Sequence, residues 1–206
     1  MVDGQDAPHV VVLAGPNGAG KSTAASVLLP RLLGVGPFVN ADVIAQGLSA
    51  FAPEKVAVTA GKIMLERLRE LAAERANFAF ETTLATRSFA RWLRRLVADG
   101  YRFELAFFYL PSPELAIARV AQRVRQGGHH VPDDDVRRRY RRGLRNLMHL
   151  YIPLATHWRV YDNGVPGVSR LIASGTRWEQ VAVFDNPLWT SLRMEYRDAH
   201  DEEAND

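Results

Sequence analysis

The sequence predicts an α/β protein in which helices lie on both faces of a mostly parallel sheet. Two observations carry this prediction: short apolar runs alternate with longer stretches of helical pattern, and the first run, residues 9–14, contains no polar alternation. The alternation of strands and helices is typical of parallel sheets, and the central strands of such sheets are apolar throughout because they are buried on both faces. With 206 residues, of which 47% are hydrophobic and 24% charged, the chain suits one domain with a packed core.

In the first half of the chain, a glycine-rich turn and a proline mark the starts of two helices. The first helix is expected to begin at Lys21, directly after the turn. Pro53 and Glu54 are expected to open a longer helix, because proline suits the first helical turn and an acid stabilises its positive end. The expected elements are strand 9–14, helix 21–33, strand 37–40, helix 53–75 and strand 77–82.

The second half contains stronger helix signals. Asp99-Gly100 predicts the end of a helix, since glycine readily adopts the left-handed conformation that follows many helices. Ser112 and Pro113 predict an N-cap and a first helical residue, and Gly127-Gly128 predicts a break. The expected elements are helix 87–99, strand 102–110, helix 113–126, helix 132–151 and two short strands, 158–162 and 168–173.

The composition and the N-terminus narrow the cellular setting. The absence of cysteine excludes disulfides, thiolate nucleophiles and cysteine-ligated zinc. No apolar run has the length needed to cross a bilayer, and the N-terminus lacks the basic start of a secretory signal. We therefore expect a cytoplasmic protein with no membrane partner, a single domain over residues 1–196 and a disordered acidic tail over residues 197–206.

Residues 15–22 match the nucleotide-binding pattern G-x-x-x-x-G-K-[ST] at every fixed position, between an apolar strand and a helix. In this loop, backbone N–H groups and the positive end of the helix surround phosphate oxygens. Lys21 is expected to reach the β- and γ-phosphates, the Ser22 hydroxyl to ligate Mg²⁺, and Thr23 to contact the α-phosphate. The predicted cofactors are ATP and Mg²⁺, and the predicted binding residues are Gly15, Pro16, Asn17, Gly18, Ala19, Gly20, Lys21, Ser22 and Thr23.

Other motifs narrow the class of nucleotide-binding protein. The sequence lacks the N-K-x-D motif of GTPases, the L-S-G-G-Q signature of transport ATPases and a typical Walker B strand. Asp42 and Glu81 instead follow the second and third predicted strands, whose carboxyl ends line the binding crevice of such a sheet. Two acids beside a phosphate-binding loop indicate a kinase, in which one carboxylate takes the proton of an acceptor hydroxyl.

Four segments of the chain resemble the zeta-toxin-like P-loop kinases. They are the phosphate-binding loop, residues 38–42 (FVNAD), residues 80–84 (FETTL), and the run 119–132 with the Arg-Arg-Tyr that follows it. The resemblance implies a P-loop NTPase three-layer sandwich with an Arg-rich helical lid over about residues 119–145. It also implies phosphorylation of a hydroxyl on a small molecule, such as the sugar nucleotide UDP-N-acetylglucosamine, and an antitoxin protein as partner.

The resemblance assigns roles to the acids after the second and third strands. Asp42 matches the base that deprotonates the sugar hydroxyl, while Glu81 and Thr83 match residues that hold the acceptor. The residues themselves leave other roles open. Asp42 is also suited to capping the helix that follows it, and Glu81 to the second shell of a metal ion or to a cap. An acid that closes an apolar strand needs a polar partner, which favours a functional role for Glu81.

The resemblance also assigns the lid. Arg123, with Arg119 one turn earlier, matches the first of two lid arginines that stabilise the transferring phosphoryl group. The second family arginine precedes a Thr-Pro pair, and the corresponding position here, before Val131-Pro132, holds His129 or His130. This position departs from the family pattern, because a neutral histidine lacks the fixed charge of a guanidinium and its ability to form two parallel hydrogen bonds. We expect His129 to contact the substrate.

Two other functions were considered: a polynucleotide kinase-like enzyme and a nucleotide-dependent switch. Nine arginines lie between Arg119 and Arg145 and the last twelve residues hold six acids, so the net charge of +3 hides a basic segment. A polynucleotide kinase-like enzyme would use such a segment, but three acids at 133–135 interrupt it and its only aromatic residue is Tyr140. A nucleotide-dependent switch without a diffusible acceptor would leave Asp42 and Glu81 without a ligand. A small-molecule kinase is therefore favoured over both.

Overall fold

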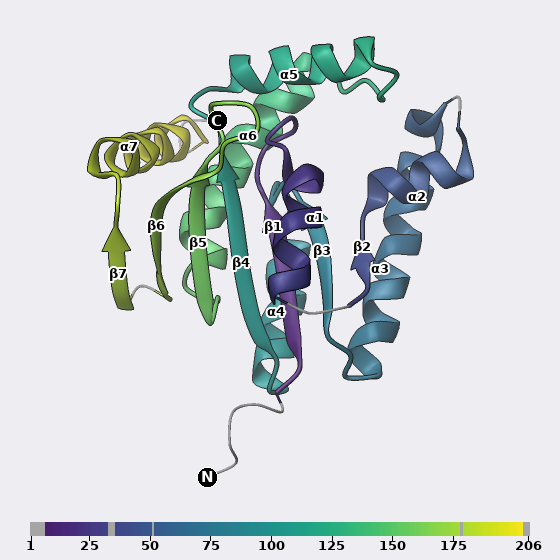
Figure 1. The fold of residues 1–206 in the computed structure, drawn as a ribbon, viewed down its shortest axis with the longest axis horizontal. Coiled ribbons are helices and arrows are strands. Elements are labelled where there is room, and N and C mark those ends of the chain that lie inside the picture. Colours follow the sequence, from purple (N-terminus) through teal and green to yellow (C-terminus); the bar gives the residue numbers. More distant parts are fainter. Residues whose placement is uncertain (1–6, 33–35, 51, 178, 204–206) are drawn as a thin grey trace.

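The computed structural model describes residues 7–32, 36–50, 52–177 and 179–203. Its seven strands form one sheet in the order β2-β3-β1-β4-β5-β6-β7 (Figure 1). The first five strands in this order pair in parallel, and β6 and β7 are antiparallel to their neighbours. The strands are β1 (His9–Ala14), β2 (Phe38–Val39), β3 (Phe78–Thr82), β4 (Arg102–Tyr109), β5 (His157–Asp162), β6 (Arg170–Thr176) and β7 (Glu179–Val183). The predicted fold class, a mostly parallel sheet, is confirmed.

The centre of the sheet explains why the apolar runs lack polar alternation. β1 lies between β3 and β4, and its residues 10–14 are fully buried, as are residues 78–80 of β3. A strand covered on both faces has no side exposed to water, so every position favours an apolar residue. In the parallel register Ala14 lies beside Thr82. The loops that leave β1 and β3 therefore start side by side at the same edge of the sheet.

Helices cover both faces of this sheet, as predicted. In Figure 1, α1 lies in front of the strands, α4 and α6 lie behind them, and α5 crosses the edge formed by their carboxyl ends. None of the described helices is both long and apolar enough to cross a membrane. The helices are α1 (Lys21–Leu32), α2 (Ala41–Leu48), α3 (Ala57–Ala73), α4 (Ser88–Ala98), α5 (Pro113–Arg125), α6 (Asp133–Asn146) and α7 (Asn186–Glu203), with a 3₁₀ turn at Pro53–Val56 and a π-helical turn at Leu147–Tyr151.

Local sequence signals set several helix ends as expected. The Ser112 hydroxyl accepts a hydrogen bond from the backbone N–H of Leu115 at 3.1 Å, so serine is the N-cap of α5. Gly100 and Gly127 each have a φ of +88° directly after a helix, where glycine meets no steric penalty. The predicted ends of α4 and α5 are therefore produced by their own residues.

The C-terminal helix α7 was not expected, and three earlier elements also differ from the prediction. The eight-residue helix α2 was not expected; it begins right after the two-residue strand β2, and its N-cap is Asn40. The helix expected from Pro53 is a 3₁₀ turn followed by α3. The strand β7, which pairs with β6 at the edge of the sheet, was also missed.

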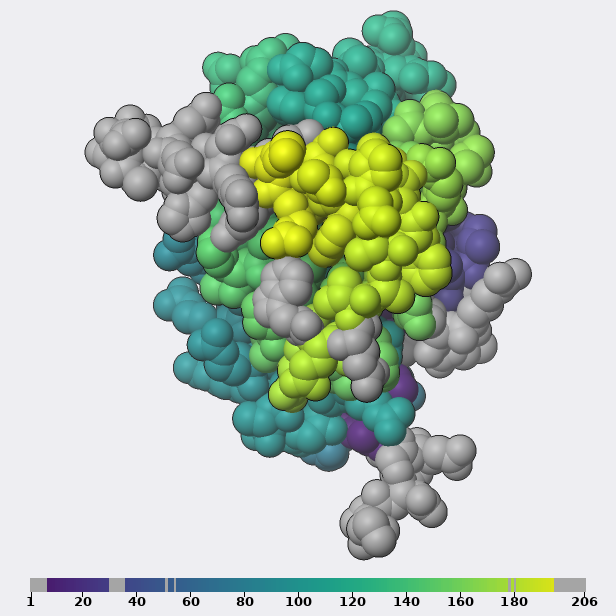
Figure 2. All heavy atoms as spheres, turned by 90° about the vertical axis from the view of Figure 1, so that its left-hand side faces the viewer, coloured from purple at the N-terminus to yellow at the C-terminus, as the bar shows by residue number. Residues whose placement is uncertain are grey.

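The C-terminal segment also differs from the prediction. Residues 197–203 continue the helix α7, where we expected a disordered tail, and residues 204–206 lie outside the described residues. The start of α7 is anchored in the core: Trp189 stacks on Trp158 with ring centroids 5.7 Å apart, and Leu192 is fully buried. Figure 2 shows α7 on the surface of this side of the molecule, below the residues of the lid. A packed first half allows the helix to extend further.

Candidate active site

The phosphate-binding loop lies between β1 and α1 and has the backbone that its glycines allow. Gly15, Gly18 and Gly20 have φ values of +143°, +76° and +78°, which residues other than glycine rarely adopt. A Cβ atom at Gly15 would lie 2.4 Å from the carbonyl oxygen of Phe108 in β4. The loop is therefore packed against β4, and its shape requires both the positive φ values of its glycines and the absence of a side chain at Gly15.

Lys21 is almost completely buried at the end of this loop. Its ammonium group donates hydrogen bonds to the carbonyl oxygens of Gly15, at 3.0 Å, and Pro16, at 2.9 Å. It also forms an ion pair with Glu81, with Nζ and Oε1 3.5 Å apart. A buried ammonium group needs such partners, because burial of an unpaired charge is costly. The lysine is thus held in place at the loop before any phosphate is bound.

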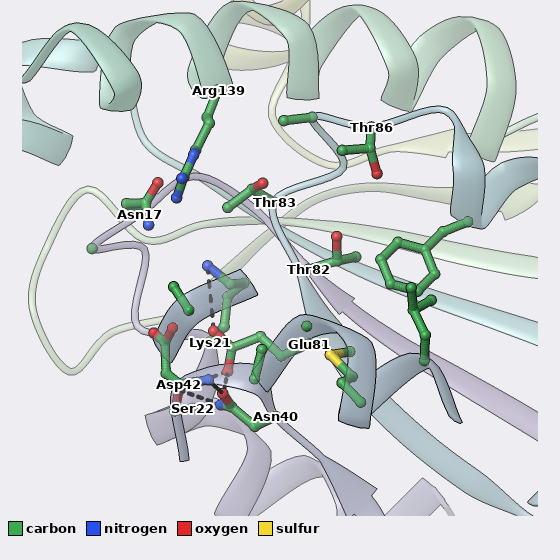
Figure 3. Close-up of a pocket in the computed structure, with 18 of the residues that line it drawn as sticks. Asn17, Lys21, Ser22, Asn40, Asp42, Glu81, Thr82, Thr83, Thr86 and Arg139 are labelled. Atoms are coloured by element: carbon green, nitrogen blue, oxygen red, sulfur yellow. Dashed lines mark hydrogen bonds and ion pairs between the residues drawn. The ribbon is translucent and has the colours of Figure 1, made fainter. Parts of the chain in front are cut away.

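Glu81, at the end of β3, lies on the phosphate side of the site. Its Oε2 atom accepts hydrogen bonds from the Ser22 hydroxyl at 2.6 Å and from the Asn40 amide at 2.9 Å. Together with Lys21, these contacts give the carboxylate three polar partners, two from the start of α1 and one from the N-cap of α2 (Figure 3). The sequence left three roles open for Glu81, and the geometry places it beside the hydroxyl that was predicted to ligate Mg²⁺.

The donors at this point suit a hard divalent cation. Ser22 and Glu81 offer a hydroxyl and a carboxylate oxygen 2.6 Å apart, and Mg²⁺ prefers oxygen ligands. In the described part of the chain, no three His, Cys, Asp or Glu side chains form a metal-binding group. Mg²⁺ in nucleotide sites is typically held by one or two protein groups together with phosphates, so the pair fits such a site.

Asn40 links the phosphate side to the start of α2. Its Oδ1 atom accepts hydrogen bonds from the backbone N–H of Asp42, at 2.8 Å, and of Val43, at 3.4 Å, and so caps the helix. Its Nδ2 group donates to Glu81. The side chain is buried, and both ends of its amide are used. Asp42 was considered from the sequence as a cap of the next helix; in the structure Asn40 caps α2, and the Asp42 carboxylate is left available for other contacts.

Replacing Asn40 by alanine is expected to lower the free energy of unfolding by about 2 kcal/mol. Loss of the cap accounts for about 1 kcal/mol, and the lost hydrogen bond to the largely buried Glu81 for about 1 kcal/mol more. Asn40→Ser keeps a good cap and should recover about half of the loss. Urea unfolding followed by circular dichroism measures both variants. Equal stability of wild type and Asn40→Ala would contradict the role given to this side chain.

Asp42 lies in the first turn of α2 and faces the lid. Its side chain is 48% exposed, and its two oxygens lie 3.9 Å from a guanidinium nitrogen of Arg123 and 3.8 Å from Nε2 of His129. The Arg123 guanidinium also donates a hydrogen bond to the His129 carbonyl, at 3.1 Å. The structure thus brings together three residues that were predicted from separate parts of the sequence.

Arg119 joins the lid helix to the phosphate-binding loop. Its guanidinium donates hydrogen bonds to the carbonyl oxygens of Gly18, at 3.4 Å, and Gly164, at 2.9 Å. A Cβ atom at Gly18 would lie 2.9 Å from Cβ of Arg119, so α5 rests directly on the loop. Asn163, in the turn after β5, donates a hydrogen bond to the Ala19 carbonyl at 2.8 Å. The loop is therefore held from two sides, by α5 and by the turn after β5.

The segment from Thr82 to Thr86, which follows Glu81, is held by α6 and the π-helical turn. Leu84 is fully buried with a φ of +59°, an unusual conformation for leucine. The Leu84 carbonyl accepts a hydrogen bond from the buried Asn146 at 2.6 Å, and the Thr86 carbonyl accepts one from Tyr151 at 3.1 Å. Burial raises the pKa of Tyr151 far above its usual value, so the phenol keeps the proton it donates.

A cavity of about 730 Å³ connects these parts (Figure 3). Nine predicted residues beyond the loop glycines line it: Asn17, Lys21, Ser22, Thr23, Asp42, Glu81, Thr83, Arg119 and Arg123. His129 does not line it; with His130 it borders a second cavity of about 560 Å³ behind the lid, although its ring reaches Asp42. His129 could therefore contact a substrate only where its ring lies beside Asp42.

Sequence reasoning missed one wall of the large cavity. It is formed by α3 and by the start of α4, which carry apolar residues and one lysine. In the sequence these positions form part of an ordinary amphipathic helical pattern, which does not separate a cavity wall from a core face. The missed lining residues include Val58, Gly61, Lys62, Met64, Leu65 and Phe89.

Comparison with known proteins gives one family match and one curated relative. The family model described as "AAA domain" (AAA_33) matches residues 10–147. An uncharacterized protein of Haemophilus influenzae is 26% identical over 130 residues, which are 63% of this chain and 91% of that protein. The family match covers the phosphate-binding loop, Asp42, Glu81 and the lid, and stops near the end of α6.

Solved structures with the same fold cover more of the chain. The AvrRxo1-ORF1:AvrRxo1-ORF2 complex, solved with sulphate ions, has a TM-score of 0.73 at 18% identity and covers 90% of this chain. The same complex solved with ATP has a TM-score of 0.72 at 19% identity. This chain spans 63% of the matched chain in both. The PezAT chromosomal toxin-antitoxin system of Streptococcus pneumoniae has a TM-score of 0.60 at 17% identity and covers 95% of this chain and 88% of its own.

Proposed function

Because the chain belongs to the AAA_33 family of AAA domains, we propose that it is an ATP-dependent kinase that phosphorylates a hydroxyl group of a small molecule. The fold shared with the AvrRxo1 and PezAT structures supports the resemblance to the zeta-toxin-like P-loop kinases. One observation carries the proposal further. A single cavity has Lys21, Ser22 and Glu81 at one end and Asp42, facing Arg123 of the lid, at its side. A donor phosphate and an acceptor hydroxyl can thus share one space.

ATP would bind with its phosphates in the loop 15–22. The backbone N–H groups and the N-terminus of α1 would surround the phosphates, and Lys21 would move from the loop carbonyls toward the β- and γ-phosphates. Mg²⁺, held through Ser22 and Glu81, would supply positive charge to the phosphate oxygens. Arg119 would keep α5 closed on the loop, since it already bridges Gly18 and Gly164.

Asp42 would act as the base on the acceptor. As the acceptor oxygen forms its bond to the γ-phosphorus, the Asp42 carboxylate takes the hydroxyl proton and ADP leaves with the electrons of the broken P–O bond. Arg123 lies 3.9 Å from this carboxylate and can hold it in position until the acceptor binds. Thr83, which lines the same cavity, would contact the acceptor, together with the wall formed by α3.

The acceptor class and the partner follow from similarity. The resemblance to zeta-toxin-like kinases supports a sugar nucleotide such as UDP-N-acetylglucosamine as acceptor. The fold shared with the PezAT toxin-antitoxin system and with a two-component AvrRxo1 complex supports an antitoxin-like protein partner. The cytoplasm is the compartment that would supply ATP and such acceptors.

The contacts of the arginine-rich segment argue against a nucleic-acid substrate. Arg137 pairs with Glu114 and Asp134, and Arg138 pairs with Asp135 at 2.6 Å. Arginines engaged by acids of α5 and α6 offer less net charge to a phosphate backbone. The three acids that interrupt the segment in the sequence thus also neutralise part of it in the structure.

A metabolite assay tests the proposed function. The purified protein is incubated with γ-labelled ATP, Mg²⁺ and a pool of small metabolites, and products are identified by mass spectrometry. We expect one metabolite to gain a phosphoryl group as ADP forms. Label transferred to RNA or DNA ends would instead support a polynucleotide kinase. Slow release of inorganic phosphate with no labelled metabolite would support a nucleotide-dependent switch and contradict the proposal.

A further inference from the structure

A third arginine reaches the large cavity, from α6 and not from α5. Arg139 lies on α6, and its side chain lines the cavity together with Asn17 of the phosphate-binding loop and Thr83 of the segment after β3. Figure 3 shows the Arg139 side chain extending from α6 toward the space between these two residues. This space separates the donor side of the proposed reaction from the acceptor side.

The other cations at the phosphate end are held by backbone carbonyls. Lys21 donates to Gly15 and Pro16, and Arg119 and Arg123 donate to carbonyls of the loop, the turn after β5 and the lid. Arg139 is different: among the described residues its guanidinium has one ion pair, to Asp135, at 4.0 Å. Such a distant and partly exposed pair contributes little, so the group can turn to an anion at small cost.

The packing of α6 fixes where Arg139 lies. Gly143, one turn further along the helix, faces the segment after β3, and a Cβ atom there would lie 2.5 Å from the Thr83 carbonyl oxygen. The absence of a side chain lets α6 approach this closely. Asn146, two turns from Arg139, adds a hydrogen bond to the Leu84 carbonyl. Two contacts on one helix thus position its arginine over the cavity.

The lid loop does not provide a second arginine. The position that the resemblance assigns to it holds His129 or His130, and both histidines border the cavity behind the lid. We propose that Arg139 supplies this second guanidinium from α6 and binds the oxygens of the phosphoryl group during its transfer. The inference rests on the proposed kinase function and adds a catalytic residue to it. The expected interaction is made mainly in the transition state, where charge on those oxygens must be stabilised.

A transition-state analogue tests Arg139 without knowledge of the acceptor. Arg139→Ala and Arg139→Lys are compared with the control Arg138→Ala, which removes the same charge one position away on the same helix. Arg138 pairs with the same Asp135, is 54% exposed and does not line the cavity. Binding of Mg²⁺-ATP and of ADP with Mg²⁺ and fluoroaluminate is measured by calorimetry, and stability by urea unfolding.

We expect Arg139→Ala to weaken the fluoroaluminate complex by about 100-fold or more and to change ATP affinity less than about threefold. Arg139→Lys should recover part of the loss, since lysine keeps the charge but not the fork. The control should match wild type in its affinity for both ligands.

Several results would overturn the inference: equal fluoroaluminate binding by Arg139→Ala and the control, equal weakening of ATP and fluoroaluminate complexes, or no fluoroaluminate complex with wild type. If fluoroaluminate binding depends on Arg139 while the metabolite assay yields no phosphorylated product, the proposed acceptor chemistry fails and the role of Arg139 in stabilising a transferring phosphoryl group stands. If a phosphorylated product forms and neither its rate of formation nor fluoroaluminate binding depends on Arg139, the kinase function stands and the role of Arg139 fails.

Discussion

Asp42→Asn should reduce kcat for phosphoryl transfer by about 10³-fold while Mg²⁺-ATP binds with nearly unchanged affinity. A positioned general base contributes roughly 10²–10⁴-fold, and an amide cannot accept the hydroxyl proton. The substitution is nearly isosteric, and the cap of α2 is supplied by Asn40, so the fold should be preserved. Rates are measured with the acceptor identified by the metabolite assay, and ATP affinity by calorimetry.

Asp134→Asn is the matched control for this change. Asp134 is 99% exposed and pairs with Arg137 on α6, outside the large cavity. It should retain the wild-type rate. Turnover of Asp42→Asn at the wild-type rate would show that another group takes the proton, and the proposed mechanism would then be wrong.

Lys21→Met should impair both ATP binding and catalysis. We expect kcat to fall by about 10²–10³-fold, the cost of removing one preorganised charge from a phosphate site, and ATP affinity to fall by at least about tenfold. The loss has a second cause, because the substitution leaves Glu81 without the cation that lies 3.5 Å away. Calorimetry and initial rates measure the two effects separately.

Lys55→Met provides the comparison for Lys21→Met. Lys55 lies in the exposed 3₁₀ turn before α3 and does not line the cavity. It should bind ATP like wild type. A Lys21→Met protein that binds ATP with wild-type affinity would argue against the placement of phosphates in the loop 15–22.

The phosphate-binding loop shows what a contiguous motif can reveal. Its glycines, its lysine and its hydroxyl residue are specified by spacing, and the structure gives Gly18 and Gly20 the positive φ values that such a turn requires. Asp42 was also found from sequence, because acids after parallel strands meet at one edge of the sheet. The roles of both remain predictions that the substitutions above address.

Glu81 shows where sequence reasoning stopped. Its position at a strand end was clear, but its partners were not, since Lys21, Ser22 and Asn40 come from the first and second strand ends. Only the adjacency of β3 to both β1 and β2 places it against all three. The resemblance alone assigned Glu81 to the acceptor, whereas these contacts place it beside Ser22.

The fold class, the phosphate-binding loop and the strand-end acids could all be predicted from the chain, because they depend on local conformation and on the period of apolar residues. Which of the many arginines face the cavity depends instead on how the helices pack. Arg138 and Arg139 are neighbours in an arginine-rich run, yet only Arg139 lines the cavity. The difference comes from the rotation and close approach of α6, set by Gly143 against Thr83 and Asn146 against Leu84. Such contacts join residues far apart in the chain, and no local pattern encodes them.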